Sequence, residues 1–298
     1  MVRRFLTVLL VFSTCSAFAG GPDVKGAHAD SKVVRVAVIG GMSMTTDLWR
    51  EISGMFEADT GYKVEVTAAG PKHGLADAMR QGKADLLTMH SSDSTTGLVA
   101  DGYAVSMRPW ARNDLVILGP ASDPAKIAGM KDGAQALRKI AMAKANYVEL
   151  QGLGKREMAH TLWKRAGIAP KGKWYLKDES EGHDDLLCFA AKNNAYVIFG
   201  RIPVVQGKIE SHNLKILVDK DPTMRRPYIV MEANPALFSG TNVKGARALS
   251  DYLLSDKVQS FLKDFGKDRN NGIAFFHPVT IDRSVISKKI ADNKGNAD

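Results

Sequence analysis

The chain contains few cysteines: among its 298 residues only Cys15 and Cys188 carry thiols. Cys15 lies in an N-terminal segment that we expect to be removed, so Cys188 would be left without an intramolecular partner. An exported protein without disulfides must be stabilised by a large apolar core. A hydrophobic fraction of 45% supplies such a core, and the length suits about two domains.

Long apolar runs are also scarce, and the clearest one lies at the start of the chain. Residues 5–12 read FLTVLLVF, which is too short to cross a bilayer. Arg3 and Arg4 precede this run and Ala17-Phe18-Ala19 follows it, which is the layout of a secretory signal peptide. We therefore predict that residues 1–19 form a signal peptide and that the mature chain is periplasmic.

Several functional motifs are missing. The basic residues, which give a formal net charge of +9, are dispersed rather than gathered in a stripe, so nucleic acid is not an expected partner. There is no Gly-x-Gly-x-x-Gly, the seven histidines form no short metal-binding pair, and Ser43 lies outside any Gly-x-Ser-x-Gly elbow. The sequence thus predicts no cofactor, no metal and no enzymatic activity. Arg225 and Arg226, near Asp221, are interpreted as surface charges.

What the chain does contain is a regular alternation of strand and helix patterns. Val33–Ile39 is a β-branched run typical of a strand buried on both faces. From Leu48 to Phe56, apolar residues recur every three or four positions, which predicts a helix that Ser43 or Thr45 could cap. Similar units follow to about residue 265. We therefore predict an α/β fold of two lobes, each a mainly parallel sheet flanked by helices, with a ligand cleft at the hinge.

Four glycine-containing loops lie between strand and helix patterns, at residues 40–43, 70–74, 151–154 and 180–183. Backbone N–H groups at such positions bind anions, although each loop alone could be an ordinary turn. These loops supply the first candidate ligand-binding residues, which are Gly40, Gly41, Met42, Ser43, Gly70, Pro71, Lys72, Gln151, Gly152, Gly154 and His183.

Longer segments carry a family resemblance that runs in order from about residue 33 to residue 280. The segments are Phe56-Glu57, Thr60–Val64, Gly82–Leu87, Gly102-Tyr103, Arg112–Ile117, Gly119-Pro120, Ser122–Ala125, Leu162-Trp163, Trp174-Tyr175, Asp221-Pro222, Pro227-Tyr228 and Asn234-Pro235. Together they resemble the substrate-binding proteins of ABC transporters, and most closely the tungstate-binding branch. The resemblance implies a two-lobed protein that closes on a small oxyanion and delivers it to an inner-membrane permease.

The binding loops depart from the pattern of that branch. Its Thr-Thr-Thr-Ser run is replaced by Ile39–Met42 and Ser43, and the position expected to hold an anion-binding Arg holds Glu149. A shift of two residues would place Tyr147 there instead. Arg201 does match an arginine of the family, so the resemblance adds Arg112, Glu149 and Arg201 as candidate site residues. A carboxylate that faces the cleft predicts weaker tungstate binding, unless Glu149 pairs with Lys155 or Arg156.

The sequence therefore predicts a monomeric periplasmic solute-binding protein for a small anion, working with an ABC transporter permease. Residues 33–113 and 226–282 would form lobe 1, residues 114–225 lobe 2, and residues 283–298 a polar tail. One alternative is a carrier of an organic acid, an amine or a metal complex, with Glu149 as counter-charge. A second, from another class, is an enzyme on a binding-protein scaffold that uses Glu149 or His183.

Overall fold

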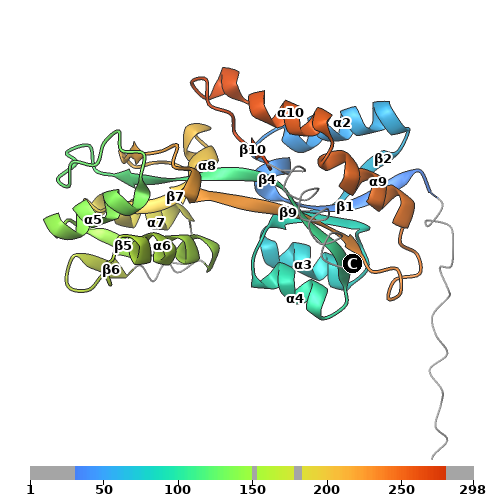
Figure 1. The fold of residues 1–298 in the computed structure, drawn as a ribbon, viewed down its shortest axis with the longest axis horizontal. Coiled ribbons are helices and arrows are strands. Elements are labelled where there is room, and N and C mark those ends of the chain that lie inside the picture. The colour runs from blue at the N-terminus through green and yellow to red at the C-terminus, as the bar shows by residue number, and fades with distance from the viewer. Residues whose placement is uncertain (1–30, 150–152, 178–182, 280–298) are drawn as a thin grey trace, which may run out of the picture.

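Two long antiparallel strands, β4 (Ala104–Gly119) and β9 (Arg225–Ala233), run side by side along the molecule, and the other elements form a group at each end (Figure 1). The computed structural model describes residues 31–149, 153–177 and 183–279. The predicted signal peptide and the predicted polar tail lie outside the described residues.

The first group surrounds the parallel strands β1, β2 and β3. Its elements are β1 (Val33–Ile39), α1 (Gly40–Ser43), α2 (Leu48–Thr60), β2 (Lys63–Gly70), α3 (Lys72–Arg80), β3 (Leu86–His90), α4 (Asp93–Ala100), α9 (Val243–Leu253), α10 (Asp256–Asp264), η2 (Lys267–Arg269) and β10 (His277–Pro278). The strand order is β10-β4-β9-β3-β1-β2. Helices α3 and α4 lie on one side of this sheet, and α2, α9 and α10 lie on the other (Figure 1).

The second group surrounds the far halves of β4 and β9. Its elements are α5 (Gly133–Ala143), β5 (Tyr147–Glu149), α6 (Leu153–Arg165), β6 (Tyr175–Lys177), α7 (His183–Lys192), β7 (Val197–Gly200), α8 (Arg201–Val205), β8 (Lys215–Val218) and η1 (Pro222–Met224). Strands β7 and β8 pair with β4, and β5 runs parallel to β6. A bridge between Tyr147 and Tyr196 joins β5 to the start of the β7 segment.

Each group has its own buried core. The first cluster of buried side chains draws on residues 34–111, Ile202 and residues 228–276. The second draws on residues 115–199 and 214–224. Both clusters come from alternating strands and helices, so the predicted α/β class is confirmed. The strands that connect the groups add antiparallel pairing to the parallel sheets that the sequence predicts.

The predicted helices and strands are present in the structure, but some of their details differ. Helix α2 begins near the predicted position and buries Leu48, Trp49, Ile52 and Phe56 against the sheet, but its N-cap is Asp47 rather than Ser43 or Thr45. The predicted loop at residues 40–43 is a single helical turn, α1. Strand β4 pairs with β9 over its first part and with β7 over its second part, so it belongs to both groups; we call β4 and β9 the crossing strands. No helix among the described residues is long and apolar enough to cross a membrane.

Candidate functional site

The first two predicted loops lie together at one edge of the sheet. Strands β1, β2 and β3 are parallel, so their carboxyl ends face the same way, and Ile39 at the end of β1 pairs with Gly70 at the end of β2. A β-carbon built on Gly40 would lie 3.6 Å from the Gly70 Cα. The carboxyl edge of parallel strands is where open α/β folds bind ligands. We call this the strand edge.

The first loop offers backbone donors and one hydroxyl to the strand edge. The turn of α1 leaves its first N–H groups without intrahelical partners. The Ser43 Oγ is buried and has no hydrogen-bond partner among the described residues. Met42 is fully buried, so its side chain belongs to the core and only its backbone can serve a ligand. Gly41 lies beside Tyr228, since a β-carbon built on it would be in van der Waals contact with the Tyr228 hydroxyl at 3.9 Å.

The second loop brings a half-buried ammonium group to the same edge. Gly70 has a φ of +142°, a conformation open mainly to glycine, and Pro71 then leads the chain into α3 at Lys72. Burial lowers the pKa of Lys72 and the positive charge of Arg226 lowers it further, while Glu157 and Asp93 act in the opposite direction. Because Glu157 lies on α6, the charges that act on Lys72 include one from the second group.

Arg226 is the residue that sequence reasoning did not assign to the site. It lies on β9 opposite Asn113, and its Nη2 donates to the Nε2 of His90 over 3.0 Å. The His90 ring in turn stacks on Tyr228, with 4.0 Å between ring centroids. The Arg226 Nε is buried and has no hydrogen-bond partner among the described residues, and burial lowers the pKa of this guanidinium. The interpretation of Arg226 as a surface charge is therefore wrong.

Arg225, the preceding residue, points to a different partner because neighbouring strand residues face opposite sides. Its Nε donates to Asp114 over 3.1 Å, and the Asp114 carboxylate also contacts the His277 Nε2 at 2.7 Å. Burial of Asp114 opposes its ionisation, but His277 and Arg225 together hold its pKa below the usual value. These contacts tie both crossing strands to β10. Asp221 instead accepts from the backbone of Gly133 and Thr223.

Arg201 and Arg112 lie near the crossing strands rather than in the loops of the strand edge. Arg201 is 6% exposed; it donates to Asn270 and lies 3.7 Å from the Asp219 carboxylate. Its partners therefore link α8 to the segment before β10. Arg112 is half-buried on β4, between Pro227 of β9 and His277 of β10 in the pairing register.

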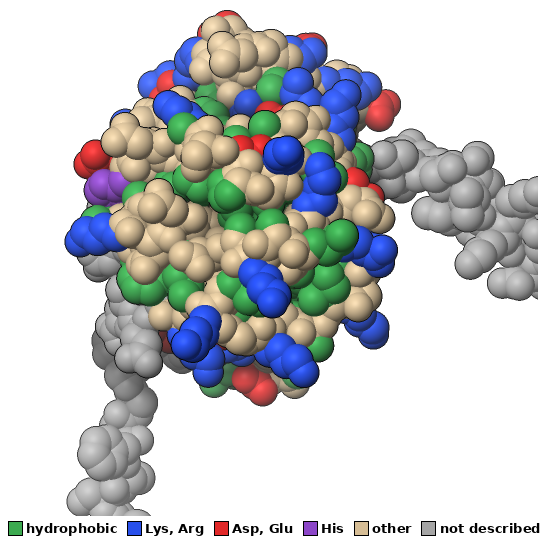
Figure 2. Space-filling model, turned by 90° about the vertical axis from the view of Figure 1, so that its left-hand side faces the viewer, with side chains coloured by type: hydrophobic (Ala, Val, Ile, Leu, Met, Phe, Trp, Pro, Cys, Tyr) green, Lys and Arg blue, Asp and Glu red, His purple; other side chains and the backbone are tan. Residues whose placement is uncertain are grey.

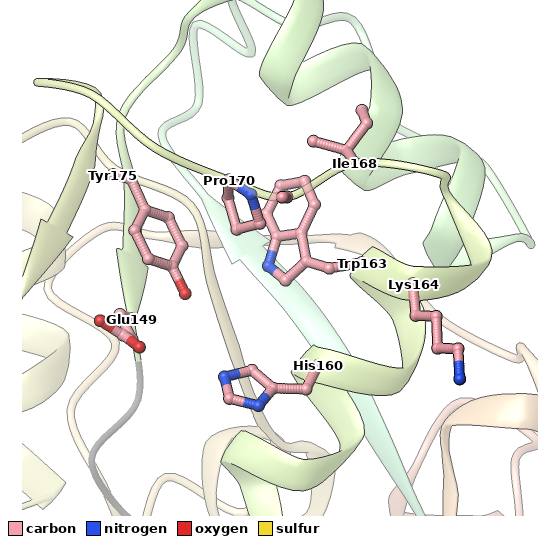
Figure 3. A pocket seen from close by; sticks show the side chains of 8 residues that line it. Glu149, His160, Trp163, Lys164, Ile168, Pro170 and Tyr175 are labelled. Carbon is pink, nitrogen blue, oxygen red and sulfur yellow. The ribbon is translucent and has the colours of Figure 1, made fainter.

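Glu149 lies at the end of β5 in a pocket of the second group (Figure 3). The pocket has a volume of about 440 Å³ and is lined by Glu149, His160, Trp163, Lys164, Ile168, Ala169, Pro170 and Tyr175. The Glu149 carboxylate lies beside the Tyr175 hydroxyl; burial, together with the charge and hydrogen bond of Glu149, raises the pKa of Tyr175 to about 12. Glu149 therefore has a hydroxyl partner within its own group.

The remaining predicted residues lie in the second group or outside the described chain. Gly154 is in the first turn of α6 and His183 begins α7, while Gln151 and Gly152 lie outside the described residues. Cys188 is a half-buried free thiol. Within the described ranges, no group of three or more His, Cys, Asp or Glu side chains is arranged to hold a metal ion.

Known proteins share this architecture. A family model described as bacterial extracellular solute-binding protein matches residues 34–267. The chain belongs to this family. A relative named tungstate-binding protein TupA, from Peptoclostridium acidaminophilum, is 32% identical across 93% of this chain and 99% of its own length.

Solved structures of family relatives give the same result. The tungstate-binding protein TupA from Desulfovibrio alaskensis G20 has a TM-score of 0.69 at 27% identity, covering 84% of this chain and all of that one. The tungstate ABC transporter structure from Geobacter sulfurreducens has a TM-score of 0.64 at 27% identity, covering 78% of this chain and 98% of that one. The predicted family resemblance is therefore confirmed.

Proposed function

We propose that this protein is the periplasmic solute-binding component of an ABC transporter and that its solute is tungstate or a closely similar tetrahedral oxyanion. The observation that carries the proposal is the strand edge, where a buried hydroxyl and a buried guanidinium N–H, neither with a partner among the described residues, accompany a half-buried ammonium group. A dianion would supply acceptors for these donors and opposite charge for Lys72 and Arg226. The tungstate-binding names of the relatives support the same solute.

The charge balance at this edge favours an anion. Arg226 is hydrogen-bonded to an imidazole rather than to a carboxylate, and Lys72 feels the charges of Glu157 and Asp93 from beyond ion-pair distance. Two partly desolvated cations without close anionic partners in the described chain are unfavourable until a ligand compensates them. The backbone N–H groups of Gly40 and Gly41 add neutral donors. Together these groups replace the arginine that the resemblance leads one to expect in the second lobe.

The two buried clusters support a division into two lobes with the predicted boundaries. Lobe 1 would comprise residues 33–113 and 226–282, and lobe 2 would comprise residues 114–225. In this arrangement the strand edge of lobe 1 and the N-terminal half of α6 form the two walls of the cleft, because Lys72 lies within electrostatic reach of Glu157. A ligand that contacts both walls would favour the closed state. The closed form would then engage an inner-membrane permease as a monomer.

The decisive experiment is isothermal titration of chain purified from a periplasmic extract with tungstate, molybdate and sulfate. We expect tungstate to bind with a Kd below about 1 μM, equivalent to about 8 kcal/mol. The radius of gyration from small-angle scattering should fall at saturation, because the two lobes close. Absence of heat with all three oxyanions at millimolar concentration would overturn the assignment of the solute. Binding without contraction would leave the solute assignment intact but contradict hinge closure.

A further inference from the structure

The end of the second group farthest from the first group has Lys and Arg side chains spread over its surface, with fewer Asp and Glu (Figure 2). A hollow there has a volume of about 470 Å³ and is lined by Lys144, Asn146, Lys171, Gly172, Lys173 and Trp174. Lys144 caps the end of α5, and the other two lysines lie in the turn before β6. All three are exposed. We call the surface formed by Met142, Lys144, Lys171, Lys173 and Trp174 the tip face.

The lysines of the tip face have no opposite charge beside them. No ion pair to Lys144, Lys171 or Lys173 occurs among the described residues, whereas many other basic residues of the described chain pair with Asp or Glu. The carbonyl ends of α5 and α6 point to this end of the molecule, but each contributes only about half a negative charge. The tip face therefore presents an excess of positive charge to solvent.

Apolar groups lie among these lysines. Met142, in the last turn of α5, is 77% exposed, more than any other large hydrophobic side chain among the described residues. Trp174 is half-buried and packs against Trp163 and Tyr175, with ring centroids 6.0 Å and 5.9 Å away. Gly172 (φ +104°) lies against the Trp174 ring, so the turn holds the flanking lysines around the indole. An anchored tryptophan and an exposed methionine between lysines are typical of a surface that meets a lipid headgroup layer.

The tip face is also separate from the solute site. Strands β5 and β6 begin at the tip, and they run toward the opposite edge, where Glu149 and the α6 N-terminus lie. A small anion would need donors that converge on it from a dry pocket, but these ammonium groups are exposed to solvent. We propose that the tip face docks the protein on the surface of an anionic phospholipid membrane. Phosphate groups of many lipids then pair with the lysines while Met142 and Trp174 contact the headgroup layer.

Vesicle sedimentation tests this proposal without any solute. Protein purified from a periplasmic extract is mixed with vesicles of phosphatidylglycerol and phosphatidylethanolamine, or of neutral phosphatidylcholine, at low ionic strength. We expect binding to the anionic vesicles only, and its loss when salt screens the charges. Each lysine near an anionic surface contributes about fivefold, so the triple variant K144Q/K171Q/K173Q should bind on the order of a hundredfold more weakly. M142S should bind a few-fold more weakly at low ionic strength, where wild-type binding is measurable.

The matched control is K63Q/K83Q/K244Q, which removes the same charge from exposed lysines of the first group. This control should bind anionic vesicles nearly as well as wild type. Equal loss in both triple variants would show a net-charge effect and overturn the tip face as the docking surface. Failure of the wild-type protein to bind anionic vesicles would also overturn it. So would displacement by millimolar inorganic phosphate at constant ionic strength, because that would indicate a discrete phosphate site. Unchanged melting temperature and tungstate titration in all variants confirm folding.

Discussion

The carboxyl ends of the parallel strands in the two groups carry side chains of opposite charge, and these side chains differ in their partners. At the strand edge of the first group, Lys72 and Arg226 are cations held in a partly desolvated environment, and the Arg226 Nε and Ser43 Oγ lack partners among the described residues. In the second group, the corresponding end of β5 carries Glu149, whose carboxylate lies beside the Tyr175 hydroxyl. One edge presents cations and donors without partners among the described residues, and the other presents a carboxylate that is hydrogen-bonded to a neutral hydroxyl.

This difference suggests where the binding energy for an anion comes from. A site that must hold a dianion needs positive charge, but the charge can come from either wall because Coulomb attraction depends on distance rather than on which lobe supplies it. The family resemblance leads one to expect an arginine in the second lobe, and Glu149 stands there instead. We propose that Arg226 and Lys72 supply the positive charge from the strand edge instead.

The largest effect is expected for Arg226→Gln, which keeps a donor but removes the charge. Two unit charges about 4 Å apart interact by about 4 kcal/mol at an effective dielectric of 20, so we expect tungstate affinity to fall by at least about a hundredfold. Isothermal titration measures the change. Arg80→Gln, on an exposed arginine paired with Asp77, is the matched control and should leave the affinity unaltered. An Arg226→Gln protein that binds within threefold of wild type would place the anion elsewhere.

The next largest effect is expected for Asp114, whose contacts join the crossing strands, and it concerns the free energy of unfolding. Asp114 has a lowered pKa, so its contribution is present above the unfolded-state value near 4 and disappears as pH falls through the lower folded-state value. Asp114→Asn should therefore cost about 2 kcal/mol in the free energy of unfolding at pH 7. Urea titrations at several pH values should show the two proteins converging below about pH 4. A difference that is constant with pH would contradict the role of ionisation.

The sequence predicts much of this fold because the strand and helix signals are local. The β-branched run Val33–Ile39 and the helical spacing after Leu48 reflect the burial of one or both faces, and the structure shows that burial. Gly70 and Pro71 also indicate the end of a strand by residue type alone, since one favours a positive φ and the other lacks an N–H. Such features place the first two loops at one edge.

The charged part of the site could not be predicted in the same way. Arg225 and Arg226 are adjacent in sequence, yet one contacts Asp114 and the other His90, because strand pairing turns them to opposite sides. That outcome depends on the register of β4 against β9, which no local pattern encodes. Similarly, Glu149 is partnered by Tyr175 only because β5 and β6 pair side by side. The sequence signal for this part of the site is the pair of cations before Pro227-Tyr228. Such a pair is equally consistent with exposed surface charges and with a binding site.

Lys72 should have a smaller effect than Arg226, because its ammonium group is only half-buried and already feels Glu157 and Asp93. We expect Lys72→Gln to weaken tungstate binding about tenfold and to reduce its dependence on salt. Lys72→Arg should retain most of the affinity, which separates charge from packing. Lys83→Gln, an exposed lysine of the same group, serves as the control in the titrations. An unchanged salt dependence in Lys72→Gln would exclude Lys72 from direct charge pairing with the anion.

The smallest effect on tungstate affinity is expected for a substitution at Glu149, which tests the second group in this comparison. A carboxylate facing the dianion would repel it strongly, so its neutralisation in Glu149→Gln would then raise tungstate affinity by orders of magnitude. Because Glu149 lines the pocket of the second group, beside the Tyr175 hydroxyl, and not the strand edge, we expect a change of no more than about threefold. The same substitution should lower the pKa of Tyr175 from its value of about 12, since the neighbouring anion that raises it is lost. Ultraviolet titration of the phenolate measures this shift, with Tyr175→Phe identifying the responsible tyrosine. A large gain in tungstate affinity in Glu149→Gln, without a shift in the tyrosine titration, would show that Glu149 faces the ligand and that both walls, not one, set the charge of the site.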